Sequence, residues 1–292
     1  VFASFEEAHR LTDADDATAL GCVDLMLRLG APSLVTYLLE TLPADDYEFI
    51  SQKTADSDRC KLQLIKAAML AADWDRAVAL IGELLGRCRC NREAHVLLGE
   101  CRYRQARAAG GSPELFAPAL EAFQGALGFL PEPEGEPQPP EVKAPVEDPV
   151  LHLRVASIYY GRAAASGFKD VGAMAKAEEH YARALQVAPT AEAWKNAGIC
   201  AYRRARLEKT TEGRKPHLKR ARKCLTESNL LDKGRPQVNA WLALCSAELG
   251  KSQVVKQALR HVLRFQERLD LPTALELAEV LLHFSDEQTA QP

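Results

Sequence analysis

The sequence predicts an all-α fold, a right-handed superhelical solenoid of antiparallel helix pairs in which some helices are elongated. Alanine and leucine dominate a chain of 292 residues that is 47% hydrophobic and 7% aromatic, and this composition favours helices over strands. The pattern Ala-x3-aromatic-x2-Ala-x4-Pro occurs twice, at Ala119–Pro131 and Ala177–Pro189. Before each copy, a bulky residue is followed three and four positions later by a pair such as Leu-Gly.

Packing explains why these residue types recur. Small residues let two helices approach closely, large residues fill the gap to the next pair, and proline ends the second helix. His95, which opens one first helix, lies 34 residues after Lys61 at the same position of the preceding pair. We therefore expect six repeats in order, at 13–45, 56–91, 92–131, 150–189, 190–234 and 237–267.

The two ends of the chain are expected to complete a single solenoid over 1–292. A partial helix around Phe2–Leu11 precedes the first repeat, and a helix at 272–284 is predicted to cap the open C-terminal end, as stacked repeats require. Because the sequence does not begin with methionine, we expect it to be a fragment of a longer protein.

In repeats three to five, the stretch from the Leu-Gly position of the first helix to the first alanine of the second helix is 8 to 11 residues longer than in a regular repeat. This excess equals about two to three helical turns. Longer helices are the simplest account, because Ser112-Pro113 is typical of a helix start. A loop is the alternative, which Gly110-Gly111 would allow. Residues 131–149, with seven prolines and six acidic residues, predict a disordered, partly polyproline loop.

Charge and hydropathy exclude several functional classes. The net charge of -3 indicates no general attraction to nucleic acid or membranes. The longest stretch without a charged residue, the twelve residues Pro236–Ala247, is too short to cross a bilayer. Charge is nevertheless uneven, because 1–60 holds twelve acidic and four basic residues whereas 203–223 holds ten basic and two acidic residues. This asymmetry bears on partners.

Motifs that would indicate catalysis or a cofactor do not stand out. The eight cysteines lack zinc-site spacing and are interpreted as buried, reduced thiols of a cytosolic protein, so no metal is expected. Gly250-Lys251-Ser252 lacks the upstream glycine of a phosphate-binding loop. His95 and His152 occupy the bulky position of their repeats and are predicted to pack. The chain is therefore predicted to be non-enzymatic, without cofactor.

The six repeats resemble the tetratricopeptide (TPR) superfamily over nearly the whole chain. Within it, the run Trp194-x3-Gly198, Leu225-Thr226-Glu227 and Val238-x2-Trp241 resembles cilia- and flagella-associated TPR proteins of the outer-dynein-arm base. This resemblance implies a cytoplasmic, axonemal scaffold linked to dynein-arm assembly or motility, with dynein-arm or tubulin components as partners. A general cytosolic adaptor, chaperone-associated or a regulatory arm of a larger protein, is the alternative.

The TPR resemblance also implies that first helices line a groove for a peptide or helix. Tyrosine occupies the groove-facing position in three repeats, with arginine beside it, which predicts a groove for an acidic or amphipathic protein segment. The predicted groove residues are Tyr103, Arg104, Tyr160, Arg162, Tyr202, Arg203 and Arg204. The alternative is that these tyrosines pack against a neighbouring helix.

A second candidate surface is a basic docking patch for an acidic protein surface, made of Arg214, Lys215, Lys219, Arg220, Arg222 and Lys223. A solvated hairpin tip is the alternative to this basic patch. Nucleic acid binding is a weaker one, because few aromatic residues are interleaved with the charges.

Overall fold

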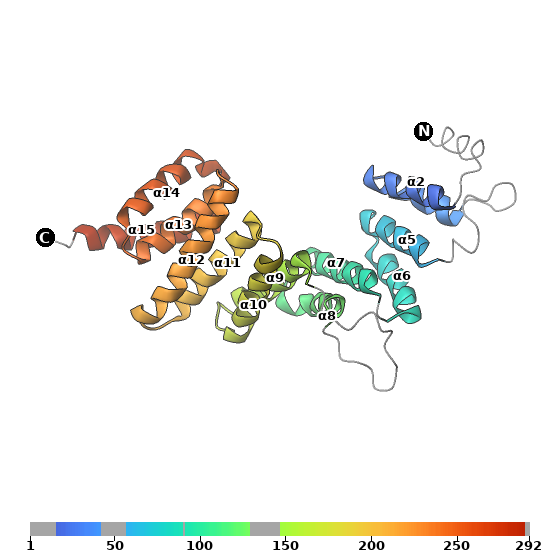
Figure 1. Ribbon diagram of the computed structural model, residues 1–292, viewed down its shortest axis with the longest axis horizontal. Coiled ribbons are helices and arrows are strands. Elements are labelled where there is room, and N and C mark those ends of the chain that lie inside the picture. Colours follow the sequence, from blue (N-terminus) through green and yellow to red (C-terminus); the bar gives the residue numbers. More distant parts are fainter. Residues whose placement is uncertain (1–15, 42–56, 90, 129–146, 290–292) are drawn as a thin grey trace. The chain divides into compact units, whose positions relative to one another are not determined.

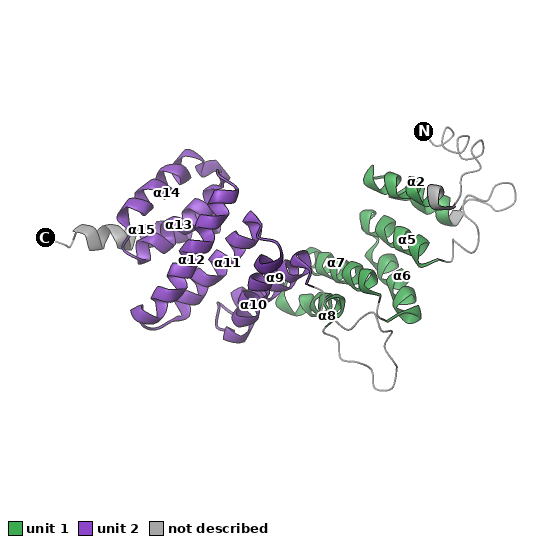
Figure 2. Ribbon diagram, viewed as in Figure 1, with its two compact units in different colours: residues 1–146 green, residues 147–292 purple. Residues whose placement is uncertain are grey.

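The computed structural model describes residues 16–41, 57–89, 91–128 and 147–289, and their regular structure is helical throughout (Figure 1). The predicted all-α class of antiparallel helix pairs is confirmed. The chain divides into two compact units, unit 1 at 1–146 and unit 2 at 147–292 (Figure 2). The partial helix predicted at Phe2–Leu11 lies outside the described residues. One continuous solenoid over 1–292 stays a prediction.

Unit 1 consists of paired helices with short turns. Its elements are α2 (Asp16–Arg28), α3 (Pro32–Thr36), the π-helical turn η1 (Tyr37–Thr41), α5 (Asp58–Leu70), α6 (Trp74–Arg87), α7 (Arg92–Ala108), the 3₁₀ turn η2 (Pro113–Phe116) and α8 (Ala117–Ala126). The starts of α5, α6 and α7 are capped by Ser57, Asp73 and Asn91, whose side chains accept a backbone N–H three residues on. Such caps satisfy donors that the helix itself leaves free.

Unit 2 has the longer helices. Its elements are α9 (Pro149–Ala165), α10 (Val171–Val187), α11 (Ala191–Leu207), α12 (Thr211–Leu231), α13 (Pro236–Glu248), α14 (Ser252–Arg264), the 3₁₀ turn η3 (Gln266–Arg268) and α15 (Leu271–Thr289). Helices α9, α10 and α11 have 17 residues each and α12 has 21, so the extra residues of these two pairs lengthen helices. In the α7–α8 pair only α7 is long, and further extra residues form the 3₁₀ turn η2.

The predicted loop at 131–149 needs a correction at its C-terminal end. Asp148 is the N-cap of α9, where its carboxylate accepts the backbone N–H groups of Val150 and Leu151 at 2.9 and 3.1 Å. Pro149 is the first residue of the helix, a position that needs no N–H donor. The predicted loop therefore cannot include Asp148 or Pro149, and residues 131–146 lie outside the described part of the chain.

The small residues of the repeat perform the predicted packing role. A Cβ atom added at Gly99 would lie 2.5 Å from the Phe123 ring, and one at Gly198 would lie 2.7 Å from Leu225 Cγ. Ala119 and Ala177, which open the repeated second-helix pattern, are fully buried. Each helix pair can therefore close only because these positions lack a larger side chain.

Helix α13 is the centre of unit 2. Its uncharged run Pro236–Ala247 is buried apart from Gln237, because α11, α12, α14 and α15 all pack around it. Helix α15 lies chiefly along α13, and its Leu277 joins the core formed there by Trp241 and Leu244. The predicted capping helix at 272–284 is thus a longer helix, 271–289, that covers one face of α13.

Candidate partner-binding surface

The three tyrosines predicted to face the groove each contact an aromatic ring of the chain itself. In unit 1, Tyr103 packs on Phe116 with ring centroids 5.3 Å apart. In unit 2, Tyr160 packs on Phe168 at 5.6 Å. These two tyrosines are half-buried, so each keeps part of its surface for a partner.

Tyr202 is not available to a partner, which corrects the prediction for this residue. Its side chain is fully buried and meets the edge of the Trp241 ring at a centroid distance of 5.4 Å. Its hydroxyl donates to the Glu248 carboxylate at 2.8 Å, and burial raises the pKa of this phenol. The alternative considered from the sequence, packing against a neighbouring helix, holds at this position.

Arg203 is also bound within the chain, which corrects the prediction for this residue. Its guanidinium donates two hydrogen bonds to Glu276 of α15, at 2.7 and 2.6 Å. The same guanidinium carbon lies 4.9 Å from the centre of the Phe168 ring and 5.1 Å from that of Trp241. The carboxylate that binds this arginine therefore comes from the chain itself and not from a partner.

The remaining predicted groove residues stay predictions. Arg104 is exposed and forms an ion pair with Glu100 at 3.0 Å. Arg162 is exposed beside the Tyr159 ring, 6.0 Å from its centre. Arg204 is half-buried, and its Nε and one terminal nitrogen are buried without a hydrogen-bond partner. Because these two nitrogens are themselves buried, they are not the part of Arg204 that a partner could reach.

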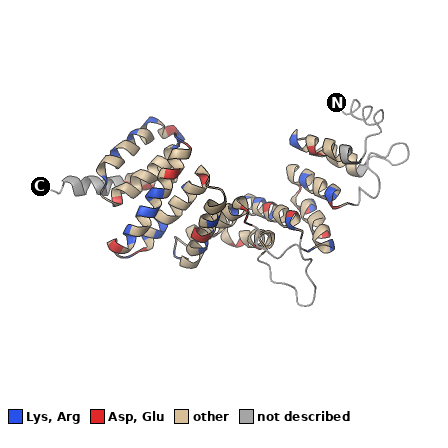
Figure 3. Ribbon diagram, in the orientation of Figure 1, with Lys and Arg blue, Asp and Glu red and all other residues tan. Residues whose placement is uncertain are grey.

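The basic patch lies on α12, where basic residues recur along the helix (Figure 3). Lys215 pairs with Glu212 at 2.6 Å, and Arg214 donates its Nε hydrogen to the carbonyl oxygen of Glu208 at 2.9 Å. Arg220 lies 3.9 Å from Glu178 of α10. Arg220 therefore faces α10, whereas Arg214 and Lys215 bond within the α11–α12 hairpin.

Three residues of the basic patch line a pocket of about 660 Å³ at the C-terminal end of α13. We call this pocket the tip pocket. Its cationic lining comes from three segments: Arg206 at the end of α11, Arg214, Lys215 and Lys219 on α12, and Lys251 after α13. Its apolar lining comes from Leu218, Ala247, Leu249 and Val280. Sequence analysis missed Arg206 and Lys251, although Lys251 belongs to the motif set aside as an incomplete phosphate loop.

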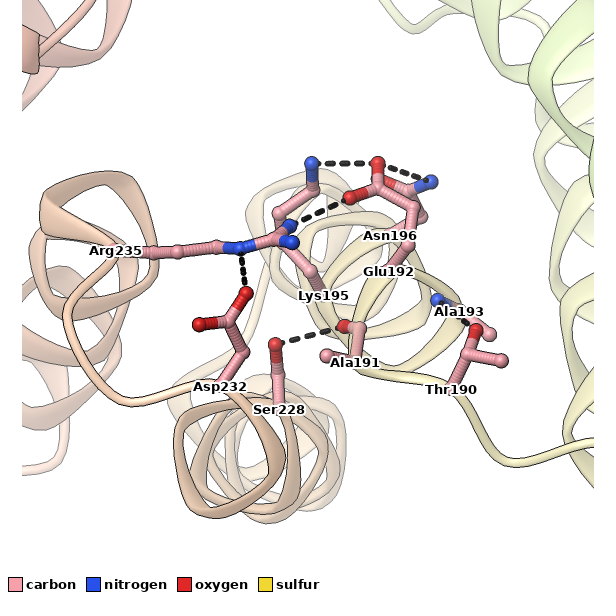
Figure 4. Close-up of polar contacts among 9 residues, drawn as sticks. All are labelled: Thr190, Ala191, Glu192, Ala193, Lys195, Asn196, Ser228, Asp232 and Arg235. Atoms are coloured by element: carbon pink, nitrogen blue, oxygen red, sulfur yellow. Dashed lines mark hydrogen bonds and ion pairs between the residues drawn. The ribbon is translucent and has the colours of Figure 1, made fainter.

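A second polar cluster lies at the opposite end of α11, where it begins (Figure 4). Glu192 accepts hydrogen bonds from Lys195 at 2.6 Å, Asn196 at 3.3 Å and Arg235 at 2.9 Å. Arg235 also binds Asp232 at 2.5 Å. Burial alone would raise the pKa of Glu192, but the bonds from Lys195 and Arg235 outweigh it and the pKa is lowered. These charges neutralise one another, so the cluster fastens α11 to the α12–α13 turn.

A buried histidine pair joins α9 to α10. Nδ1 of His152 lies 2.9 Å from Nδ1 of His180, and Nε2 of His152 lies 3.1 Å from a Glu147 carboxylate oxygen. Because a carboxylate only accepts, His152 carries its hydrogen on Nε2 and accepts at Nδ1 from His180. Burial and the neighbouring His152 ring lower the pKa of His180 to about 4, and burial also lowers the pKa of His152, so both rings are neutral at pH 7.

No disulfide joins the described cysteines, and Cys60, Cys101, Cys200, Cys224 and Cys245 are buried as predicted. Cys88 is exposed, which corrects the prediction for that residue, and Cys90 lies outside the described residues. The described ranges contain no cluster of three or more His, Cys, Asp or Glu side chains placed to hold a metal ion. Within the same ranges, no helix is both long and apolar enough to cross a membrane.

Among the comparisons with known proteins, only those with solved structures give matches. No protein-family model matches the chain, and no curated protein matches it. A thermophilic TPR protein of Thermus thermophilus, TTC0263, is 16% identical, with 77% of this chain and all of that chain covered and a TM-score of 0.41. Human IFIT1, solved as a dimer with PPP-AAAA, is 15% identical, with 89% of this chain and 56% of that chain covered and a TM-score of 0.45.

Cut9, in the Cut9–Hcn1 hetero-tetramer of the APC/C, is 11% identical, with 94% of this chain and 50% of that chain covered and a TM-score of 0.40. The chain thus spans about half the length of the IFIT1 and Cut9 chains.

Proposed function

We propose that this chain is a non-enzymatic scaffold that binds another protein through the α11–α12 hairpin of unit 2. The observation that carries the proposal is the positive charge of this hairpin, ten basic residues against two acidic ones within 203–223. The hairpin is held rigidly, because Gly198 lets α11 pack closely on α12 and Ser228 donates to the Ala191 carbonyl oxygen at 2.8 Å. A rigid cationic surface suits an acidic protein segment, with little ordering cost on binding.

Capture by the intact chain tests this proposal. The chain is immobilised and exposed to axonemal extract and to cytosolic extract, and each captured protein is purified and its affinity measured. A variant with glutamine at all six positions of the basic patch, checked for helicity by circular dichroism, is expected to lose that affinity. Undiminished binding by the variant would remove the hairpin from the proposal, and a lack of saturable binding by the native chain would overturn the scaffold itself.

The finer proposal is that the scaffold belongs to the ciliary axoneme and contacts dynein-arm or tubulin components. The resemblance of the run from Trp194 to Trp241 to cilia- and flagella-associated TPR proteins supports it. Tagged full-length protein in ciliated cells tests it, and enrichment along cilia is expected. A diffuse cytosolic signal would instead favour a general adaptor, chaperone-associated or the regulatory arm of a larger protein.

A further inference from the structure

Cationic side chains predominate among the charged residues that line the tip pocket. Five cationic side chains line it against a single carboxylate, that of Glu248. Glu248 is already bound within the chain, because it accepts hydrogen bonds from Tyr202 at 2.8 Å and from Arg206 at 3.2 Å. The negative charge of Glu248 is therefore already bound within the chain, and the pocket presents an excess of positive charge to solvent.

Three of the cations have no carboxylate partner among the described residues. Lys219 and Lys251 are exposed and form no ion pair or hydrogen bond there, and Arg214 bonds only to a backbone carbonyl oxygen. Glu212, which pairs with Lys215, acts on Lys219 only through a longer-range charge interaction. Lys219 lies on α12 and Lys251 lies in the turn between α13 and α14, so they reach the pocket from two separate elements. Unpaired charges that converge from different elements favour an anionic ligand held between them.

The apolar lining narrows the class of ligand. Leu218 and Ala247 are buried beneath the pocket, and Leu249 and Val280 are half-buried beside it. The opening holds about 660 Å³, which is enough for one or two apolar side chains. A ligand that only carries charge would leave this lining exposed to water, whereas one with an apolar side chain between acidic groups would cover it.

Helix α15 explains why the ligand would bind at this end of the helices. Helix α15 packs on α13, and its Glu276 binds Arg203 of α11. Val280, one helical turn after Glu276, forms one edge of the tip pocket. The pocket thus begins where the described side chains of α15 leave the first-helix face uncovered.

We propose that the tip pocket binds an acidic peptide segment of another protein, with an apolar side chain against Leu249 and Val280 and carboxylates at Lys219 and Lys251. This inference rests on the proposed function, because it names the ligand chemistry of the same hairpin. The acidic source is a protein segment, since charge and apolar contact are both required. Single-stranded nucleic acid is the competing ligand that the experiment must exclude.

Fluorescence anisotropy with the full chain tests the proposal. The probe is a fluorescein-labelled 12-residue peptide of repeated Glu-Glu-Leu, and a second probe has serine in place of each leucine at the same charge. The leucine peptide is expected to bind at least about 10-fold more tightly than the serine peptide, because its apolar side chains are buried. Equal affinities would overturn the apolar part of the site.

Two matched double variants locate the binding site. Lys219→Glu with Lys251→Glu is expected to weaken the leucine peptide about 10-fold or more, because both partners of its carboxylates are reversed. Arg222→Glu with Lys223→Glu makes the same change of charge on α12 outside the pocket, and is expected to weaken binding less than about 3-fold, through long-range charge alone. Equal losses would reduce the binding to general electrostatics and overturn the site. Thermal melts are expected to match the native chain in both cases.

A 12-nucleotide single-stranded RNA, labelled in the same way, is the third probe. Tighter binding of RNA than of the leucine peptide, with loss of RNA binding in the Lys219→Glu, Lys251→Glu variant, would overturn the proposal in favour of nucleic acid.

The proteins captured from extract distinguish a failure of this inference from a failure of the proposed function. If their affinity survives the Lys219→Glu, Lys251→Glu variant, the tip pocket is wrong and the scaffold stands, whereas absence of capture by the native chain overturns the scaffold.

Discussion

A fall in pH from 7 to 5 is expected to destabilise unit 2 through the histidine pair of α9 and α10. His180 is buried, its ring centroid lies 5.1 Å from that of His152, and the ring of Tyr159 stacks on its other side at 6.0 Å. A proton on His180 would place a charge among these rings, where water cannot solvate it.

The charged groups around the pair act in opposite directions. Glu179 favours the protonated form of His180, whereas Arg183 and Lys176 oppose it. Their net effect is smaller than that of burial, which is the largest cause of the lowered pKa.

The magnitude follows from linkage between proton binding and folding. The pKa of His180 is about 4 in the folded chain, against about 6.5 for an unfolded histidine. The unfolded chain therefore takes up the proton first, so the contribution is fully present above pH 6.5 and is lost as the pH falls toward 4. Between pH 7 and pH 5 the free energy of unfolding is expected to fall by about 2 kcal/mol from this group.

Urea denaturation followed by tryptophan fluorescence measures this loss. Trp194 and Trp241 lie in unit 2, and a Trp74→Phe background removes the signal of unit 1. His180→Gln removes this titrating ring, so the difference between the variant and its parent separates the contribution of His180 from that of the carboxylates.

His217→Gln serves as the matched control, because it removes a histidine of α12 and leaves the pair intact. This control is expected to lose as much stability as the parent between pH 7 and pH 5, whereas His180→Gln is expected to lose about 2 kcal/mol less. If His180→Gln and its parent lose the same amount, the buried pair does not set the pH dependence and the reasoning fails.

Three further predictions concern packing, ion pairing and thiol reactivity. Gly198→Ala is expected to lower the free energy of unfolding by about 1–3 kcal/mol, because the added methyl group meets α12. Gly161→Ala, whose methyl group would meet nothing within 4 Å, is expected to raise the free energy of unfolding by about 0.5–1 kcal/mol. Urea denaturation compares the two variants, and equal effects would contradict the close packing at Gly198. Glu276→Gln is expected to cost about 1–2 kcal/mol by removing the charge of a half-buried ion pair, and unchanged hydrogen exchange in α13 and α15 would refute it. Cys88 is expected to react with N-ethylmaleimide in the native chain while Cys200, whose pKa burial raises to about 12, reacts only after unfolding; mass spectrometry after brief labelling distinguishes them, and modified Cys200 in native protein would be the contrary result.

Local sequence patterns predicted much of the fold. The two Ala-x3-aromatic-x2-Ala copies are the second helices α8 and α10, with Phe123 and Tyr181 buried as the pattern requires. Ser112-Pro113 was typical of a helix start, yet it opens a 3₁₀ turn, and the Ser112 side chain caps nothing. The choice between longer helices and a loop was open from sequence, because both satisfy the same residue count.

The candidate site was harder to predict because it depends on contacts between distant residues. Arg203 and Glu276 are 73 positions apart, and no local pattern connects them. The uncharged run Pro236–Ala247 did contain a usable signal. A helix that is apolar on every side needs a cover on every side, and α15 supplies the cover that a simple end cap would not.

The sequence by itself determined the helix pairs, the positions where glycine and alanine let them close, and the cationic character of the α11–α12 hairpin. These follow from residue periodicity and composition, which act over a few helical turns. Only the tertiary structure decided which cations remain available to a partner. Ion pairing depends on which elements come together in space, and docking of α15 on α13 binds Arg203 while Lys219 and Lys251 stay unpaired at the tip pocket.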